Sequence, residues 1–252
     1  MKKLITILFL MVGSVVHAQK PTHYYVNVST SQGNAILKLY NETPKHRDNF
    51  VKLAKEGFYD SLLFHRVIHN FMIQGGDPES RFAADRVQLG NGGLDYKIPA
   101  EIQSDLIHRK GTIGAARDNN PAKQSSASQF YFVQGRKYSQ GGLDSLEQFR
   151  MKGKKLSPIQ RQAYSTVGGT PHLDGNYTVF GELLTGVEIV DKIAVVETDS
   201  FDRPLKNERI AMQLLTRREA INLERKYKGL QPRNSFFTKL LDSFKSKYYT
   251  IQ

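Results

Sequence analysis

Short runs of β-branched, aromatic and aliphatic residues, separated by turn-forming residues, dominate the chain. Residues 23–30 and 34–40 are two such runs, and Ser31-Gln32-Gly33 between them is typical of a hairpin turn. Many short strands at turn-punctuated intervals predict a mainly β, antiparallel barrel or sandwich, in preference to alternating βαβ units. Further strands are predicted at residues 62–68, 71–75, 96–101, 112–116, 129–133, 179–183 and 209–215.

Two helices are predicted among these strands. The first begins at Thr43-Pro44, an N-cap followed by proline at the first helical position, and ends before Gly57. The second covers residues 186–194. In both, hydrophobic residues recur at helical spacing and form one apolar face. These residues are Phe50, Leu53 and Ala54 in the first helix, and Val187, Val190 and Ala194 in the second.

Two segments interrupt the pattern of strands. Residues 136–166 are predicted to be a basic insertion, with one helix in 143–151 and another starting at Ser157-Pro158. Residues 216–252 are predicted to be a basic C-terminal extension that contains an amphipathic helix. The apolar face of that helix consists of Phe237, Leu240, Leu241, Phe244 and Tyr248.

The N-terminus has the pattern of a secretory signal peptide. Lys2 and Lys3 precede a run of mostly apolar residues, 4–16, and Val16-His17-Ala18 resembles a small-residue cleavage site. We therefore expect residues 1–18 to be removed and residues 19–215 to form an exported, periplasmic or secreted domain. No later stretch approaches the roughly 18 apolar residues of a membrane span. The chain has no cysteine, which excludes disulfides and thiolate metal sites.

The formal net charge of +12 is unevenly distributed. Residues 136–166 contain seven basic and two acidic residues, and residues 216–252 contain nine basic and three acidic residues. Without these segments and the signal peptide, the chain is close to neutral. This distribution argues against a nucleic-acid groove built into the domain, and we expect no nucleic-acid partner. It favours solvated basic faces, or weak attraction to anionic surfaces or acidic clients.

Arg66 is the one cation in an otherwise largely apolar run, FHRVIHNFMIQGGDP, at residues 64–78. A guanidinium cannot lose its proton to escape burial, so its presence requires a reason. Taken alone, Arg66 is better explained as an arginine on the surface of an edge strand. His65 and His69 have the spacing of a zinc-binding pair, but the glutamate of H-E-x-x-H is absent and the stretch is predicted to be a strand. No metal site is predicted here.

Four blocks occur in a characteristic order: FHRVIHNFMIQGGDP, then GTIGAAR (111–117), SASQFYFV (126–133) and HLDGNYTVFGEL (172–183). Together they resemble the cyclophilin-type peptidyl-prolyl cis-trans isomerases, over residues 23–135 and 167–214. The resemblance implies a mainly β fold, an eight-stranded antiparallel closed barrel capped by two helices. To this barrel the chain would add a helical insertion and a helical C-terminal extension. The resemblance also implies an active groove on the outer face of the barrel, without metal or cofactor.

The same resemblance implies roles for individual residues. Arg66 would donate a hydrogen bond to the prolyl nitrogen, and Gln74 would position Arg66 and the substrate backbone. Ala116 and Gln129 would line the groove. The apolar pocket for the proline ring would consist of Phe71, Met72, Tyr131 and Leu173.

Four groove positions differ from the residues found in many members of the family. His172 replaces tryptophan, and we expect weak cyclosporin binding because the indole donor is missing. Tyr177 replaces histidine, and Arg117 replaces asparagine. Tyr131 replaces phenylalanine, which predicts a more polar pocket wall. All three of these replacements are expected to permit isomerisation.

Three functions are compatible with the sequence. The first is a monomeric isomerase that acts on proline-containing peptides and on folding exported proteins. The second is a cyclophilin-fold chaperone or scaffold that binds clients through the insertion and the extension, with little isomerase activity. The third is binding to nucleic acid or anionic surfaces, which the export signal and the neutral domain disfavour. The presence of both Arg66 and Gln74 favours the enzyme, because a pure binding module needs neither.

Overall fold

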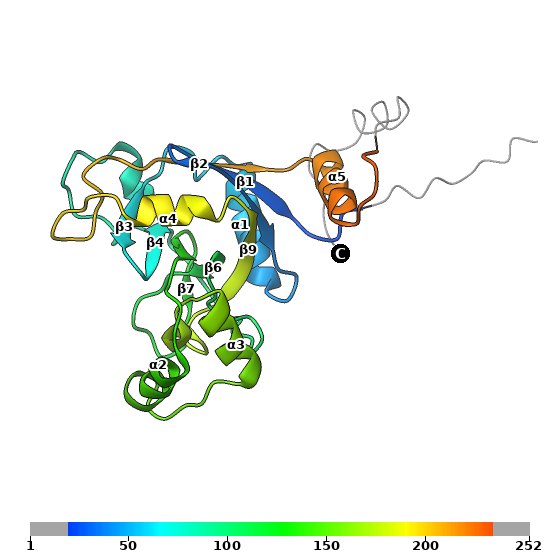
Figure 1. Cartoon of the computed structure of the whole chain (residues 1–252). Coiled ribbons are helices and arrows are strands. Elements are labelled where there is room, and N and C mark those ends of the chain that lie inside the picture. The colour runs from blue at the N-terminus through cyan, green and yellow to red at the C-terminus, as the bar shows by residue number, and fades with distance from the viewer. Residues whose placement is uncertain (1–19, 234–252) are drawn as a thin grey trace, which may run out of the picture.

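The computed structural model describes residues 20–233. The predicted signal peptide and the amphipathic helix predicted around Phe237–Tyr248 lie outside the described residues. Eight strands form one antiparallel sheet in the order β10-β1-β2-β9-β6-β8-β4-β3 (Figure 1). They are β1 (Tyr25–Thr30), β2 (Gly33–Leu39), β3 (Phe64–Ile68), β4 (Met72–Gly75), β6 (Thr112–Ala115), β8 (Phe130–Val133), β9 (Val179–Thr185) and β10 (Ile210–Leu214).

The prediction of a closed barrel is wrong, because the sheet is a half-barrel whose edge strands β3 and β10 do not form a continuous ladder. The edges meet at one corner, where Leu63 and Arg209 form an isolated bridge. Two backbone hydrogen bonds surround this bridge, from Phe64 N to Glu208 O (2.9 Å) and from Ile210 N to Leu62 O (2.8 Å). On its other edge, β10 pairs along its whole length with β1.

Two helices cover the hydrophobic core, as predicted. They are α1 (Pro44–Lys55) and α4 (Glu188–Ala194), and Figure 1 shows α4 crossing the sheet. Their buried faces join the inward-facing strand residues in one cluster. The contributing helix residues are Phe50, Val51, Leu53 and Ala54 of α1, and Ile189, Val190, Ile193 and Ala194 of α4.

The N-terminus of α1 is capped differently from the prediction. Thr43 occupies the N-cap position, but its side chain makes no capping hydrogen bond. The free backbone N–H groups of Lys45 and His46 instead donate to the carboxylate of Glu101, at 3.0 and 2.9 Å. A distant carboxylate therefore satisfies the donors and complements the positive end of the helix.

The strand predicted over residues 96–101 is mostly absent. Only Lys97–Ile98 is extended and paired, as β5, with β7 (Ser125–Ser126) in a separate two-stranded sheet. Pro99 follows directly, and proline has no N–H to continue the ladder. A 3₁₀ helix, η1 (Pro78–Phe82), precedes this region.

Residues 136–166 contain α2 (Gln140–Ser145), a π-helical turn η2 (Leu146–Arg150) and α3 (Pro158–Thr166). These elements lie together at the lower end of the molecule in Figure 1. They surround a small hydrophobic cluster of their own, formed by Leu143, Leu156 and Tyr164. Ser157 and Gln160 form a capping box at the start of α3. A short 3₁₀ helix, η3 (Pro171–Leu173), follows.

An additional helix, α5 (Arg217–Tyr227), follows β10 and was not predicted. A capping box formed by Thr216 and Glu219 starts it. The carboxylate of Glu224 then accepts hydrogen bonds from Thr22 N (2.6 Å) and from the hydroxyl of Tyr25 (3.2 Å). These bonds attach α5 to the beginning of β1. Within residues 20–233, no helix combines the length and hydrophobicity that a membrane crossing requires.

Candidate functional site

The register of four neighbouring strands aligns a row of residues on the outer face of the sheet. Arg66 on β3 is opposite Gln74 on β4, Gln74 is opposite Tyr131 on β8, and Tyr131 is opposite Gly114 on β6. Successive residues of a strand point to opposite faces, so the adjacent row, including Ile73 and Phe132, belongs to the core. The sheet itself thus brings these four positions together.

This face carries a cavity of about 170 Å³, which we call the apolar pocket. Its buried part consists of Met72, Ala116, Tyr131 and Leu173, which pack in a cluster separate from the main core. Flat rings and a flexible methionine suit a small aliphatic ring. The lining residues are Arg66, Phe71, Met72, Gln74, Ala116, Arg117, Tyr131, Leu173 and Tyr177.

Arg66 is accommodated because its side chain lies at the rim of the apolar pocket. Its neighbours His65 and Val67 are buried, whereas the Arg66 side chain is 44% exposed. Its Nε lies 3.5 Å from a carboxylate oxygen of Asp202. The main chain of Asp202 is held beside β3, because Val67 N donates to the backbone oxygen of Asp202 at 2.8 Å. The charged guanidinium therefore remains in contact with solvent, and the Asp202 carboxylate orients its Nε edge.

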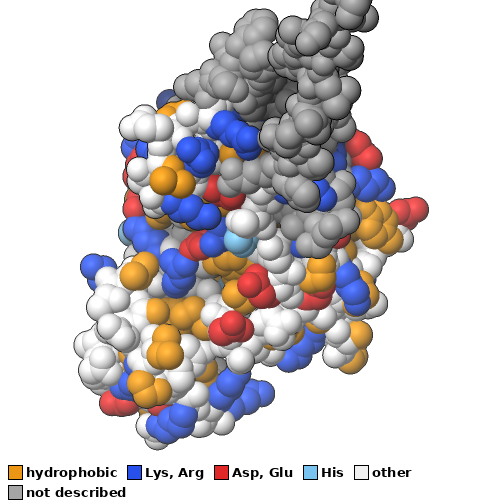
Figure 2. Space-filling view, turned by 90° about the vertical axis from the view of Figure 1, so that its right-hand side faces the viewer, with side chains coloured by type: hydrophobic (Ala, Val, Ile, Leu, Met, Phe, Trp, Pro, Cys, Tyr) orange, Lys and Arg blue, Asp and Glu red, His pale blue; other side chains and the backbone are white. Residues whose placement is uncertain are grey.

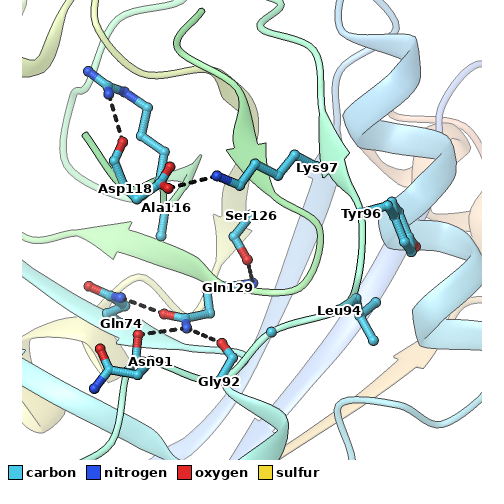
Figure 3. Close-up of a pocket in the computed structure, with 13 residues that line it drawn as sticks. Gln74, Asn91, Gly92, Leu94, Tyr96, Lys97, Ala116, Asp118, Ser126 and Gln129 are labelled. Atoms are coloured by element: carbon cyan, nitrogen blue, oxygen red, sulfur yellow. Dashed lines mark hydrogen bonds and ion pairs between the residues drawn. The ribbon is translucent and has the colours of Figure 1, made fainter. Parts of the chain in front are cut away.

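A larger cavity of about 580 Å³, which we call the polar groove, adjoins the apolar pocket through the shared residues Gln74, Ala116 and Arg117. At the boundary, Gln74 Nε2 donates to Gln129 Oε1 at 2.9 Å, and the Gln129 amide reaches the 90–92 loop (Figure 3). On the far side, Lys97 and Asp118 form an exposed ion pair at 2.7 Å. The other lining residues are Gly90, Asn91, Gly92, Gly93, Leu94, Tyr96 and Ser126.

Tyr131 does not present its hydroxyl to the apolar pocket as the sequence suggested. The hydroxyl lies 2.8 Å from Nε2 of His108, which is fully buried. His108 Nδ1 lies 2.8 Å from Asp174 Oδ1, and Tyr164 of α3 donates its hydroxyl to Asp174 Oδ2 at 2.6 Å. Burial, with the nearby Tyr177 and Asp174, raises the pKa of Tyr131 well above its usual value. Tyr131 therefore presents only its neutral aromatic ring to the apolar pocket.

His172 and Tyr177 occupy different positions around the apolar pocket. The His172 ring stacks against Phe71, with centroids 5.6 Å apart, and does not line the cavity. Burial, helped by the charge of Arg150, lowers the pKa of His172 to about 4, so the ring is neutral near pH 7. Tyr177 does line the cavity, and the Arg117 guanidinium lies 4.7 Å from the centre of its ring.

Of the ten site residues named from the sequence, eight line the apolar pocket, Gln129 is one hydrogen bond away and His172 supports Phe71. Four residues connected to the site were not predicted from the sequence: Asp202, His108, Asp174 and Tyr164. Each reaches the site only through the tertiary structure, so no local spacing identifies it. Residues 20–233 contain no group of three or more side chains arranged to hold a metal ion.

Comparison with known proteins places this geometry in a family. Residues 25–213 match the family described as "Cyclophilin type peptidyl-prolyl cis-trans isomerase/CLD". This match includes every residue that lines the apolar pocket, together with residues 136–166 and Asp202.

Curated relatives agree with the family match. A peptidyl-prolyl cis-trans isomerase of Schizosaccharomyces pombe is 33% identical over 185 residues, which cover 72% of this chain and 92% of that protein. A putative peptidyl-prolyl cis-trans isomerase of Staphylococcus aureus is 36% identical over 181 residues, 71% and 85% of the two chains. A putative bifunctional phosphatase/peptidyl-prolyl cis-trans isomerase of Streptococcus pyogenes is 38% identical over 184 residues. That match spans 71% of this chain but only 36% of the streptococcal protein.

Among solved structures, a cyclophilin type peptidyl-prolyl cis-trans isomerase of Cryptosporidium parvum has the same fold. It matches with a TM-score of 0.56 and 24% sequence identity, and the alignment covers 76% of this chain and 97% of that one.

Proposed function

The chain belongs to the cyclophilin-type peptidyl-prolyl cis-trans isomerases, and we propose that Arg66 drives catalysis by donating a hydrogen bond to the prolyl nitrogen. Gln74 positions Arg66 and the peptide backbone, and the apolar pocket holds the proline ring. Gln129, Ala116, Tyr177 and His172 complete the groove. The observation that carries this proposal is the placement of a half-exposed, carboxylate-oriented guanidinium at the rim of a buried apolar pocket.

The chemistry requires no nucleophile or base. Rotation about an X-Pro bond faces a barrier of about 18–20 kcal/mol, because the nitrogen lone pair is delocalised into the carbonyl. In the twisted state the lone pair is localised on nitrogen and accepts a hydrogen bond. A fixed donor therefore binds the twisted state more tightly than either planar state, which lowers the barrier.

The energies are compatible with this mechanism. A typical turnover of about 10–1000 per second, against uncatalysed exchange over tens to hundreds of seconds, requires roughly 4–7 kcal/mol. One charge-assisted hydrogen bond contributes about 1.5–3 kcal/mol. Burial of the ring in the apolar pocket and orientation of the peptide by Gln74 supply the remainder.

Exchange of an X-Pro peptide, measured by NMR, tests the proposal with the protein and its Arg66→Ala variant. We expect fast exchange that drops by more than about tenfold in the variant, the loss of one charge-assisted hydrogen bond. Arg225→Ala is the matched control, because Arg225 lies on α5, at the opposite side of the molecule from β3 (Figure 1). Full activity in Arg66→Ala would refute the assigned site.

We further propose that the natural substrates are folding exported proteins and that the enzyme acts as a monomer in the periplasm. The leader-like pattern of residues 1–18 supports export. Fusion of these residues to a reporter that is active only after export tests this proposal. Reporter activity is expected, and a reporter retained in the cytoplasm would refute it.

Binding of unfolded clients is a second candidate function, and it could coexist with isomerisation. We propose residues 136–166 as an insertion and 216–252 as an extension of the domain. In the former segment Phe149 and Ile159 are each 78% exposed. Figure 2 shows basic side chains beside hydrophobic ones at the lower end of the molecule, the end at which Figure 1 places α2 and α3. Suppression of aggregation by an Arg66→Ala protein would support client binding independent of catalysis.

A further inference from the structure

We propose that Tyr164, Asp174 and His108 are positioning residues that fix the ring of Tyr131, so that segment 136–166 controls how tightly the proline ring binds. The inference rests on the proposed role of the apolar pocket as the proline site. It assigns a function to α3, an element that contributes no residue to the pocket lining.

A continuous chain of hydrogen bonds leads from α3 to the apolar pocket. Tyr164 donates to Asp174 at 2.6 Å, Asp174 pairs with His108 at 2.8 Å, and His108 contacts the Tyr131 hydroxyl at 2.8 Å. Tyr164 and His108 are fully buried, and Asp174 and Tyr131 are nearly so. Hydrogen bonds of this length between buried groups fix orientation, because solvent cannot replace a missing partner.

The carboxylate of Asp174 determines the direction of the hydrogen bonds. It accepts from the backbone N–H of His108 at 2.9 Å as well as from the ring. Because a carboxylate only accepts, His108 Nδ1 carries the proton that it donates to Asp174. In the neutral ring, Nε2 then accepts from the Tyr131 O–H. The Tyr131 hydroxyl proton is thus directed to His108 and away from the pocket.

The Tyr131 ring is also confined from below and from the side. A Cβ placed on Gly114 would lie 2.4 Å from the Tyr131 hydroxyl oxygen, so the ring lies directly over this glycine. Tyr177 meets the ring edge-on, with centroids 6.1 Å apart. The anchored hydroxyl removes the remaining freedom, rotation of the side chain about χ1 and χ2. The position of the Tyr131 ring in the wall of the apolar pocket therefore depends on its hydrogen bond to His108. Tyr164 of α3 supports that bond through Asp174.

Tyr164→Phe tests the proposal because it removes a single oxygen atom from the chain of hydrogen bonds. Tyr138→Phe is the matched control: Tyr138 packs against the same small cluster, and its hydroxyl makes no hydrogen bond within residues 20–233. We expect Tyr164→Phe to raise KM for an X-Pro peptide about three- to tenfold, the range of one hydrogen bond, with little change in kcat. Tyr138→Phe should leave KM unchanged.

The same two substitutions in a Tyr131→Phe background separate positioning from general stability. The chain of hydrogen bonds is then already broken at the pocket, so Tyr164→Phe should not change KM further. A merely structural role would instead lower the unfolding midpoint equally in both backgrounds and leave KM alone. An unchanged KM in Tyr164→Phe, or the same change in both backgrounds, would overturn the proposal.

NMR of the Tyr131 ring protons gives a readout that does not depend on turnover. These resonances should shift in Tyr164→Phe and stay in place in Tyr138→Phe, and unshifted resonances in Tyr164→Phe would also overturn the proposal. The Arg66→Ala experiment separates the two inferences. If Arg66→Ala is inactive while Tyr164→Phe has the original KM, only the role of α3 fails. If Arg66→Ala is fully active, the proposed site fails.

Discussion

Gln74 and Gln129 interlock at the boundary between the apolar pocket and the polar groove, with the Gln74 amide donating to the Gln129 carbonyl oxygen at 2.9 Å. The Gln129 amide nitrogen in turn donates to Gly90 O at 2.9 Å and to Gly92 O at 2.6 Å. Two carbonyl partners determine which end of Gln129 is nitrogen, and so its oxygen must face Gln74. Within residues 20–233 this is the only hydrogen bond of the Gln74 side chain, so its own oxygen remains available as an acceptor.

Gln129→Ala should impair both stability and activity. The substitution removes three hydrogen bonds of about 1 kcal/mol each, so we expect unfolding in urea to show a loss of about 2–4 kcal/mol. Isomerase kcat/KM should fall about tenfold or more, because Gln74 loses its support. Gln74→Ala is the comparison: it removes one hydrogen bond, and should reduce activity to a similar extent at a stability cost of about 0.5–1.5 kcal/mol. Equal stability losses in the two variants would contradict this arrangement.

Asp202→Asn should reduce activity with almost no effect on stability. Asp202 has a positive φ of 62°, which asparagine adopts as readily as aspartate, so the loop is preserved while the charge beside Arg66 is lost. The ion pair is about half exposed and contributes less than about 1 kcal/mol to folding. We expect a several-fold lower kcat, since Arg66 is no longer oriented.

Asp144→Asn provides the control for Asp202→Asn. It removes an exposed carboxylate that pairs with Arg161 at 2.9 Å, in α2 and outside both cavities. This variant should retain its kcat. A kcat for Asp202→Asn that equals that of Asp144→Asn would show that Arg66 needs no carboxylate partner.

Much of the site could be predicted from the sequence, because the spacing of residues along a strand determines which face of the sheet each side chain occupies. Arg66 and Gln74 belong to one block and Tyr131 to another, but residues that share a face at matching register lie side by side across a sheet. The resemblance supplied the order of these blocks. The three residues therefore meet without any information from loops.

The features that were missed depend on contacts between distant segments. Asp202 reaches Arg66 because the two edges of the half-barrel meet near Leu63 and Arg209. No pattern in the sequence indicates where these edges meet. Helix α5 did have one, the capping box Thr216–Glu219, but its few hydrophobic residues give a weak periodic signal. The Tyr131 hydroxyl was expected in the pocket because its partner His108 could not be identified from spacing.

Gly114→Ala should disrupt the apolar pocket from beneath. A Cβ at this position would lie 2.4 Å from Tyr131, closer than van der Waals contact permits, and the ring is held by its hydroxyl. We expect a loss of about 1–3 kcal/mol in unfolding free energy, typical of overpacking, together with a large loss of kcat/KM. Gly93→Ala, in the polar groove, is the matched control, because a Cβ there meets no atom within 4 Å. Equal stability for the two variants would contradict the tight packing of Tyr131 on β6.

Acid should destabilise the protein partly through His65, a residue of β3 whose side chain is buried. Burial lowers the pKa of His65 to about 4; the nearby Asp77 opposes this shift, and the charges of Arg66 and Arg203 add to it. The unfolded chain takes up a proton at His65 below about pH 6.5, whereas the folded protein does so only near pH 4. The contribution of His65 to stability is therefore complete above pH 6.5 and is lost as the pH falls towards 4.

Urea unfolding between pH 7.5 and pH 4.5 measures this contribution. His65→Gln cannot titrate, so its stability should fall less steeply with acid, by up to about 1.4 kcal/mol per pH unit below pH 6.5. Titrating groups that do not interact with His65 act equally in both proteins, so the difference in slope reports on His65 and its immediate charged neighbours. The same slope in His65→Gln as in the unsubstituted protein would show that burial does not hold His65 neutral.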